Sequence, residues 1–100
     1  MFITIISATY IEKYAIQCEF SDGKIGVVDL LPFLQGVVFE PLKNIEEFQK
    51  FSIDSDLETI VWANGADFAP EFLYFQAFKN DESLKSQFTK WGYLTKESIA

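Results

Sequence analysis

The sequence predicts a small α+β domain, in which a mixed or antiparallel sheet built from hairpins is joined to two or three short helices. Residues 58–62 are rich in β-branched and aromatic side chains, which favour a strand. Asn64-Gly65 favours a tight turn directly after it, and Pro70 suits the first position of a helix. A chain of 100 residues, 49% of them apolar, can bury one core, so we expect a single domain over residues 1–100.

Alternating side chains predict the first two strands. Residues 2–10 carry apolar side chains on both faces, which indicates an interior strand. Residues 14–20 are predicted to form a half-buried strand, with Gln17 and Glu19 on its polar face. Its apolar face is formed by Tyr14, Ile16, Cys18 and Phe20.

The dipeptide Asp22-Gly23 indicates a two-residue hairpin loop after this strand. A loop of that length sets these pairs: Phe20 with Ile25, Cys18 with Val27 and Ile16 with Asp29. The last pair places a carboxylate on an apolar face, which costs several kcal/mol without a partner. We therefore expect the strand to end before Asp29, whose carboxylate then caps a helical turn over residues 30–34.

Helix signals follow in the second half of the chain. Asn44, with Glu47 three residues later, indicates a helix start, and an apolar stripe on that helix consists of Ile45, Phe48 and Phe51. A second helix is expected from Pro70 to about residue 79. Between them, the Asn64-Gly65 turn is expected to bring these residues together: Asp67 with Trp62, and Phe68 with Val61.

Residues 80–100 are predicted to form a helical C-terminal extension. Leu84, Phe88 and Trp91 have the spacing of an amphipathic helix that begins at residue 80 or 81 and ends at Gly92. The pattern leaves open whether this helix packs on its own domain or forms a separate arm.

The composition excludes several classes of function. Eight Lys against fifteen Asp plus Glu give a net charge of −7, which repels phosphate backbones and anionic lipids. We therefore expect no direct nucleic-acid partner and no membrane association. Without His and Arg the chain lacks the usual general base, the commonest metal ligand and bidentate phosphate clamps, so we expect no enzyme, no catalytic residue, no metal and no cofactor.

Two features favour a cytoplasmic location. Cys18 is the only cysteine, so no internal disulfide forms, and its place in a strand indicates a buried side chain. Residues 1–10 have neither a basic leader nor an apolar run long enough for a signal peptide or a membrane span.

Aromatic residues make up 17% of the chain, more than a domain of this size easily hides. Because aromatic residues are enriched where subunits meet, a protein partner or a homo-oligomer is expected. The candidate interface residues are Tyr74, Phe75, Phe88, Trp91 and Tyr93. Ordinary packing in the core is the alternative.

The carboxylates offer weaker candidates. Asp54, Asp56 and Glu58 have the spacing of a hard-cation site, but a solvated strand edge is the simpler interpretation. Asp67 and Glu71 are candidates for an acid–base pair or for caps. Asp67, Glu71 and Trp62 are also the candidates for lining a small-ligand pocket. Tyr74 is a further candidate for the same pocket. The residues assigned to structural caps and turns are Asp22, Gly23, Asp29, Asn44, Asn64 and Gly65.

Several motifs stand in the order and spacing of a known family: Phe20-Ser21-Asp22-Gly23, Val28-Asp29-Leu30, Phe39-Glu40-Pro41-Leu42, Ile60-Val61-Trp62, Asn64-Gly65-Ala66-Asp67 and residues 70–74. With them the chain resembles, over residues 3–75, the bacterial domain of unknown function family 2442. The resemblance implies the small α+β fold of the N-terminal domain of structurally known members, and no catalytic residue. Longer members of the family continue into a helix-turn-helix DNA-binding domain. Short members often lie beside a gene for another small protein, which suggests toxin–antitoxin-like pairs. Here the residues after Phe78 are few and not basic enough for that DNA-binding domain, so we expect this chain to correspond to the partner-binding part.

These observations lead to one hypothesis and two alternatives. The chain is expected to be a non-catalytic cytoplasmic interaction domain, such as the acidic, antitoxin-like or regulatory partner of a small basic bacterial protein. The first alternative is a module that binds a small ligand. The second is an enzyme that uses carboxylates alone, with Asp29, Asp67 or Glu71 as acid or base.

Overall fold

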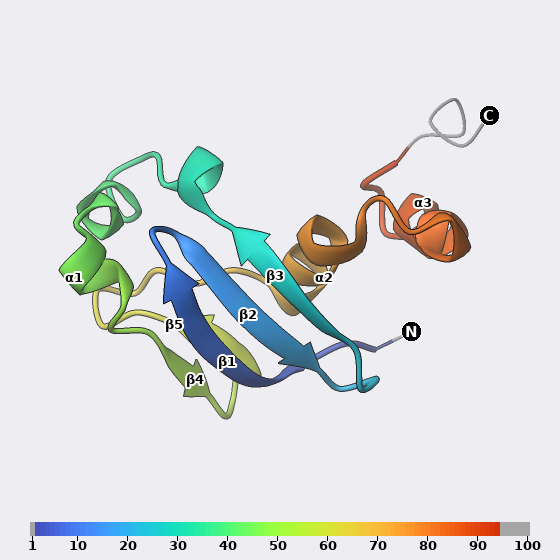
Figure 1. The fold of residues 1–100 in the computed structure, drawn as a ribbon, viewed down its shortest axis with the longest axis horizontal. Coiled ribbons are helices and arrows are strands. Elements are labelled where there is room, and N and C mark those ends of the chain that lie inside the picture. Colours follow the sequence, from blue (N-terminus) through green and yellow to red (C-terminus); the bar gives the residue numbers. More distant parts are fainter. Residues whose placement is uncertain (1, 95–100) are drawn as a thin grey trace.

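The computed structural model describes residues 2–94, which form an α+β domain (Figure 1). The strands are β1 (Ile5–Glu12), β2 (Ala15–Phe20), β3 (Ile25–Asp29), β4 (Ser52–Asp54) and β5 (Thr59–Val61). The α-helices are α1 (Ile45–Phe48), α2 (Pro70–Phe78) and α3 (Lys85–Lys90), and three 3-10 turns span Leu31–Phe33, Glu40–Lys43 and Glu82–Leu84. The predicted fold class is confirmed.

Two antiparallel sheets form the β part of the domain. The larger has the order β1-β2-β3, and the smaller pairs β4 with β5. In Figure 1 the larger sheet faces the reader, with β5 and α2 behind it and α3 to one side. The smaller sheet lies next to β1, where the Ile5 N–H donates to the Glu58 carbonyl at 2.9 Å.

The core lies between the larger sheet and the elements behind it. Ile16, Cys18 and Phe20 of β2 are completely buried, whereas Gln17 and Glu19 are half-buried on the other face, as the alternation predicts. Burial raises the pKa of the Cys18 thiol to about 12, because the thiolate would lose its hydration.

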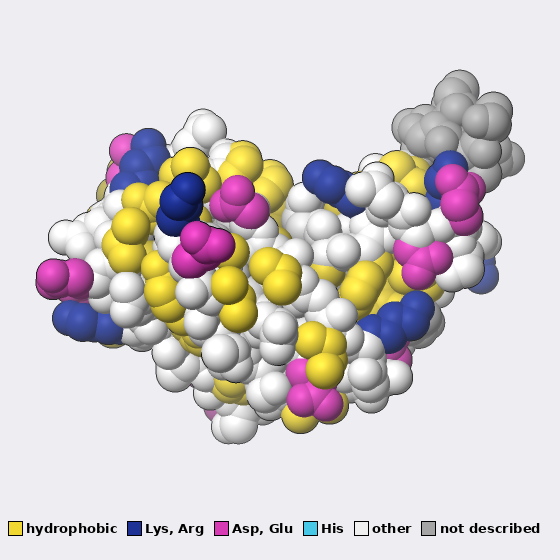
Figure 2. Space-filling model, viewed as in Figure 1, with side chains coloured by type: hydrophobic (Ala, Val, Ile, Leu, Met, Phe, Trp, Pro, Cys, Tyr) yellow, Lys and Arg dark blue, Asp and Glu magenta, His cyan; other side chains and the backbone are white. Residues whose placement is uncertain are grey.

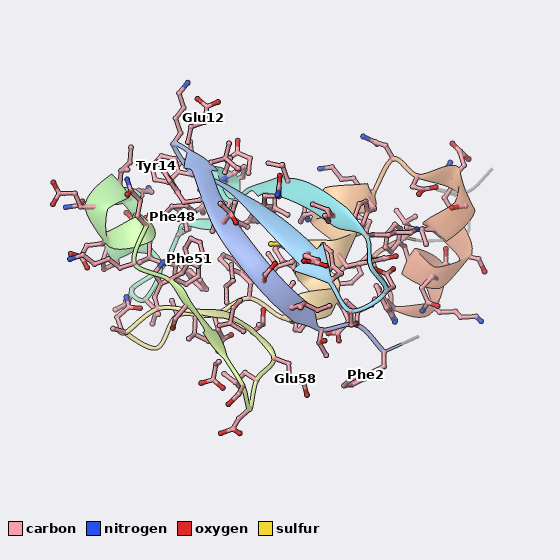
Figure 3. All side chains as sticks on the ribbon, turned by 60° about the horizontal axis from the view of Figure 1, so that its bottom comes forward. Phe2, Glu12, Tyr14, Phe48, Phe51 and Glu58 are labelled. Carbon is pink, nitrogen blue, oxygen red and sulfur yellow. The ribbon has the colours of Figure 1, made fainter. Side chains whose placement is uncertain are left out.

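Aromatic side chains join the tip of the β1–β2 hairpin to α1. Tyr14, Phe48 and Phe51 lie together there, while Glu12 points away from the body (Figure 3). The rings of Tyr14 and Phe48 are 5.3 Å apart in an edge-to-face arrangement, and the Tyr14 hydroxyl donates to the Lys43 carbonyl.

The register predicted for the β2–β3 hairpin is wrong by one residue. The Phe20 N–H donates to the Lys24 carbonyl, so the loop has three residues, and Gly23 takes the left-handed conformation with a φ of 90°. A two-residue type I′ loop would require a positive φ at Asp22, and the φ of Asp22 is not positive. The actual partners are Cys18 with Gly26 and Ile16 with Val28.

The corrected register also removes the misfit at Asp29. This residue pairs with Ala15 on the exposed face and belongs to β3, so the expectation that the strand ends before it is wrong. Its carboxylate nevertheless accepts a hydrogen bond from the Leu31 N–H at 3.1 Å, at the start of the 3-10 turn.

The hairpin at Asn64-Gly65 repeats the three-residue arrangement. The Trp62 N–H donates to the Ala66 carbonyl at 2.9 Å, and Gly65 has a φ of 92°. As a result Asp67 lies opposite Val61, and the predicted pairing of Asp67 with Trp62 is wrong.

The helices begin at the residues that their caps predict. The Asn44 side chain accepts the Glu46 N–H at 3.0 Å, and α2 begins at Pro70. The Asp81 carboxylate accepts the Ser83 N–H at 2.9 Å and starts the 3-10 turn that leads into α3. Leu84 and Phe88 are buried, so the extension packs on its own domain as far as it is described, and its residues 95–100 lie outside the described part.

Candidate interaction surface

The aromatic residues predicted to form a partner interface pack against one another within the chain. Tyr74 and Phe88 have no exposed surface, which makes them core residues and corrects their assignment to an interface. The ring of Phe75 lies 5.0 Å from that of Phe88 and stacks on that of Tyr93 at 4.9 Å, and Trp91 lies 5.9 Å from Tyr74. Tyr93 is 36% exposed to solvent. The aromatic surplus therefore holds α3 against α2.

A hydrogen bond joins α2 to the β2–β3 hairpin. The Tyr74 hydroxyl donates to the Asp22 carboxylate at 2.7 Å, and the Lys24 amine lies 4.0 Å from the Asp81 carboxylate. Burial raises the pKa of Tyr74, and the hydrogen bond to Asp22 and the charges of Asp22 and Asp81 raise it further. These contacts fix the position of β3 relative to α2.

Two of the three candidates for a small-ligand pocket, Trp62 and Asp67, border different cavities. Trp62 is buried, donates its indole N–H to the Phe48 carbonyl at 2.9 Å, and borders a cavity of about 190 Å³. Asp67 is exposed and borders a different cavity of about 250 Å³, next to Pro70. Glu71 lies in the first turn of α2, where its charge adds to burial in raising the pKa of Tyr93.

The acidic run forms a turn. The Asp54 carboxylate accepts hydrogen bonds from the N–H groups of Asp56 and Leu57 at 2.8 and 2.9 Å. Within residues 2–94, no group of three or more His, Cys, Asp or Glu side chains is placed to hold a metal ion.

An exposed apolar face of the larger sheet was not predicted. Ile25 and Val27 of β3 are 57% and 51% exposed to solvent. They pair with Glu19 and Gln17 of β2, respectively. Figure 2 looks onto this sheet and shows hydrophobic side chains spread across it. The two-residue loop places Ile25 and Val27 in the core, so only the correct loop length reveals this surface.

The outer edge of β3 has no strand partner in the part of the chain that the structure describes. Lys24 accepts a backbone hydrogen bond from Phe20 at the end of β2, and Leu30 donates one to Tyr14, the residue before β2. Because antiparallel residues alternate, Gly26 and Val28 also face β2, and the backbone groups of Ile25, Val27 and Asp29 point outward.

A cavity of about 350 Å³ lies beside this edge. Its walls come from β3, from the first 3-10 turn and from α2: Val28, Asp29, Pro32, Phe33, Gln76 and Lys79. On the exposed face itself, Glu19 and Asp29 are the charged residues that β2 and β3 contribute. We name Ile25, Val27, Asp29 and Glu19 the β3 surface.

Comparison with known proteins identifies the family. A family model described as "Protein of unknown function (DUF2442)" matches residues 5–79. The chain belongs to this family. No curated protein matches the chain.

The DUF2442 chain is also similar to a solved structure. That crystal structure, of NE0471 from Nitrosomonas europaea, is described as a "putative DNA binding protein". The TM-score is 0.71 at 16% sequence identity, and the match covers 94% of this chain and 63% of that chain. The chain therefore spans less than two-thirds of that protein, and the similarity concerns the fold.

The expectation that nucleic acid is no direct partner is wrong as an inference from charge. It rests on the net charge of −7, yet a protein with the same fold is described as a putative DNA binding protein. Net charge sums over the whole surface, whereas a phosphate backbone meets only the charges beneath it.

None of the helices within residues 2–94 is long and apolar enough to cross a membrane.

Proposed function

We propose that this protein is a non-catalytic cytoplasmic interaction domain that binds a small basic protein through the β3 surface. The observation that carries the proposal is the exposure of Ile25 and Val27 beside the carboxylates of Glu19 and Asp29. Apolar side chains gathered on one face favour a protein partner, and neighbouring carboxylates favour a basic one. The net charge of −7 supports the same sign of partner.

The chemistry of the described residues supports binding over catalysis. The carboxylates considered as acid or base lie on three different elements: Asp29 in β3, Asp67 in the hairpin at Asn64-Gly65 and Glu71 in α2. The buried thiol of Cys18, with its raised pKa, supplies no nucleophile.

The test uses two variants that gain the same charge. We incubate the tagged parent protein and its variants Val27→Lys and Val37→Lys with extract of the native host. Bound proteins are identified by mass spectrometry. The candidate partner is then purified, and its affinity for each protein is measured by calorimetry. Val37 is 93% exposed and is not part of the β3 surface, so it is a matched control. We expect a basic partner whose affinity for Val27→Lys falls about tenfold or more, while Val37→Lys binds like the parent.

Two results contradict the proposal. Equal loss of affinity in both variants shows that added charge, and not the β3 surface, controls binding. Absence of any basic partner that binds the purified parent removes the function itself.

A second candidate function is DNA binding. It is favoured by the solved structure of the same fold that is described as a putative DNA binding protein. A mobility-shift titration with mixed-sequence duplex tests it: a shifted band that weakens as salt rises supports DNA binding by this chain, and no shift at low salt rejects it.

A further inference from the structure

We infer that the partner contributes an extended segment that adds to the larger sheet as a fourth strand beside β3. In this segment, apolar residues directed toward α2 alternate with Lys or Arg residues directed to the exposed face. This inference rests on the proposed function and specifies how the partner binds.

The backbone of β3 is the available edge. Ile25, Val27 and Asp29 direct their N–H and C=O groups away from β2. The opposite edge, on β1, is occupied, because the Ile5 N–H is bonded to Glu58 and the smaller sheet lies alongside. An unpaired apolar edge is the template on which extended peptides add to a sheet.

Each face of an added strand would meet a suitable surface. On the exposed face its side chains would lie next to Ile25 and Val27. On the other face they would point toward α2, where residues Val28, Phe33 and Lys79 contribute to the walls of the cavity of about 350 Å³. An apolar side chain on that face would fill the cavity and cover Phe33.

The charges select the sequence of the segment. Side chains of an added strand lie one strand away from Asp29 and two strands away from Glu19, and both of these are carboxylates on the exposed face. Lys or Arg in the added strand would therefore be attracted by Asp29 as a cross-strand neighbour and, more weakly because of the greater distance, by Glu19. Acidic residues there would be repelled.

The same charges disfavour a second copy as the occupant. Two β3 strands in antiparallel pairing would bring two copies of Asp29 and Glu19 onto one continuous face. Each copy also carries a net charge of −7. Two chains that both carry a large negative net charge repel each other, so a basic heterologous segment fits this edge better.

The experiment titrates the full chain, labelled with ¹⁵N, with short synthetic peptides. One peptide alternates Val and Lys, and a second replaces every Lys by Glu. Two further Val/Lys peptides are N-methylated, one at the odd residues and one at the even residues. Both carry the same residues, but each lacks the backbone N–H groups along a different edge of the peptide strand. Hydrogen exchange of the β3 amides is the second readout.

The Val/Lys peptide is expected to bind and to slow exchange at the amides of Ile25 and Val27 about tenfold or more, because these amides gain partners. The amides of Gly26 and Val28 already face β2 and should change little. The Glu peptide should bind about tenfold more weakly or worse. Only one N-methylated peptide should fail, since only one set of its N–H groups faces β3.

Three outcomes overturn the inference. If both N-methylated peptides bind like the parent peptide, the segment lies on the face without pairing to the edge. If the Glu peptide binds as well as the Lys peptide, the charge argument is wrong. If the amides of Ile25 and Val27 are already protected in a dimer of the chain alone, the occupant is a second copy. In the first two cases the capture experiment with Val27→Lys still decides the proposed function independently.

Discussion

At the scale of single residues, Gly26 decides how closely α2 approaches the sheet. A Cβ atom at this position would lie 2.9 Å from Ala77 Cβ and 3.0 Å from the ring of Phe78. Its φ is not positive, so the backbone conformation does not by itself require glycine. The glycine is therefore required by packing, and it lets α2 lie directly behind β3.

Replacing this glycine should destabilise the fold. We expect Gly26→Ala to lower the free energy of unfolding by about 1–3 kcal/mol, because the added methyl group overpacks the contact between β3 and α2. Chemical denaturation followed by circular dichroism measures the change.

A double variant separates packing from other effects. Ala77→Gly removes the Cβ atom nearest to the new methyl group, so Gly26→Ala should cost less in that background. An equal cost in both backgrounds would show that the clash with Ala77 is not the cause.

At the scale of elements, α3 is too short to be stable alone and depends on its contacts with α2. It has six residues and forms a folded element because Phe88 packs among Tyr74, Phe75 and Trp91. The extension predicted from Leu84, Phe88 and Trp91 thus belongs to the core.

Truncation of the central ring should therefore affect the whole domain. We expect Phe88→Ala to reduce the free energy of unfolding by about 3–5 kcal/mol, since a completely buried aromatic side chain is lost. The exposed Ser86 of the same helix provides the control, because Ser86→Ala should change stability by less than about 0.5 kcal/mol. Thermal unfolding at the same temperature for Phe88→Ala and the parent would indicate a separate arm.

At the scale of the whole molecule, the distribution of charge matters more than its sum. The chain carries a net charge of −7, and ion pairs at Lys43–Glu40, Lys50–Glu47 and Lys85–Glu82 neutralise much of the basic charge locally. The net charge of −7 sets the electrostatic field at long range, but it does not exclude nucleic acid, because binding depends on which charges lie on the contacting face.

The two glycine-containing loops show what the local sequence does not determine. Asp22-Gly23 and Asn64-Gly65 predict turns, which the structure confirms, but they predict loops of two residues where both loops have three. The dipeptide fits either loop, since glycine supplies a positive φ in both, and only the hydrogen bonds between the strands distinguish them. One residue of register decides which face of β3 is buried.

Local signals determined much of this protein before any tertiary structure was considered. Alternation placed Ile16, Cys18 and Phe20 in the core, and Asn44, Pro70 and Asp81 marked where helical segments begin, because periodicity and capping act over a few residues.

Tertiary structure alone decided three features: the register of the hairpins, the burial of the aromatic residues between α2 and α3, and the exposed β3 surface. It also formed β4, whose three residues Ser52–Asp54 are too few for alternation alone to predict a strand and which pairs with β5. These features depend on contacts between residues far apart in the chain, and a pattern of neighbouring residues does not encode which face another element will cover.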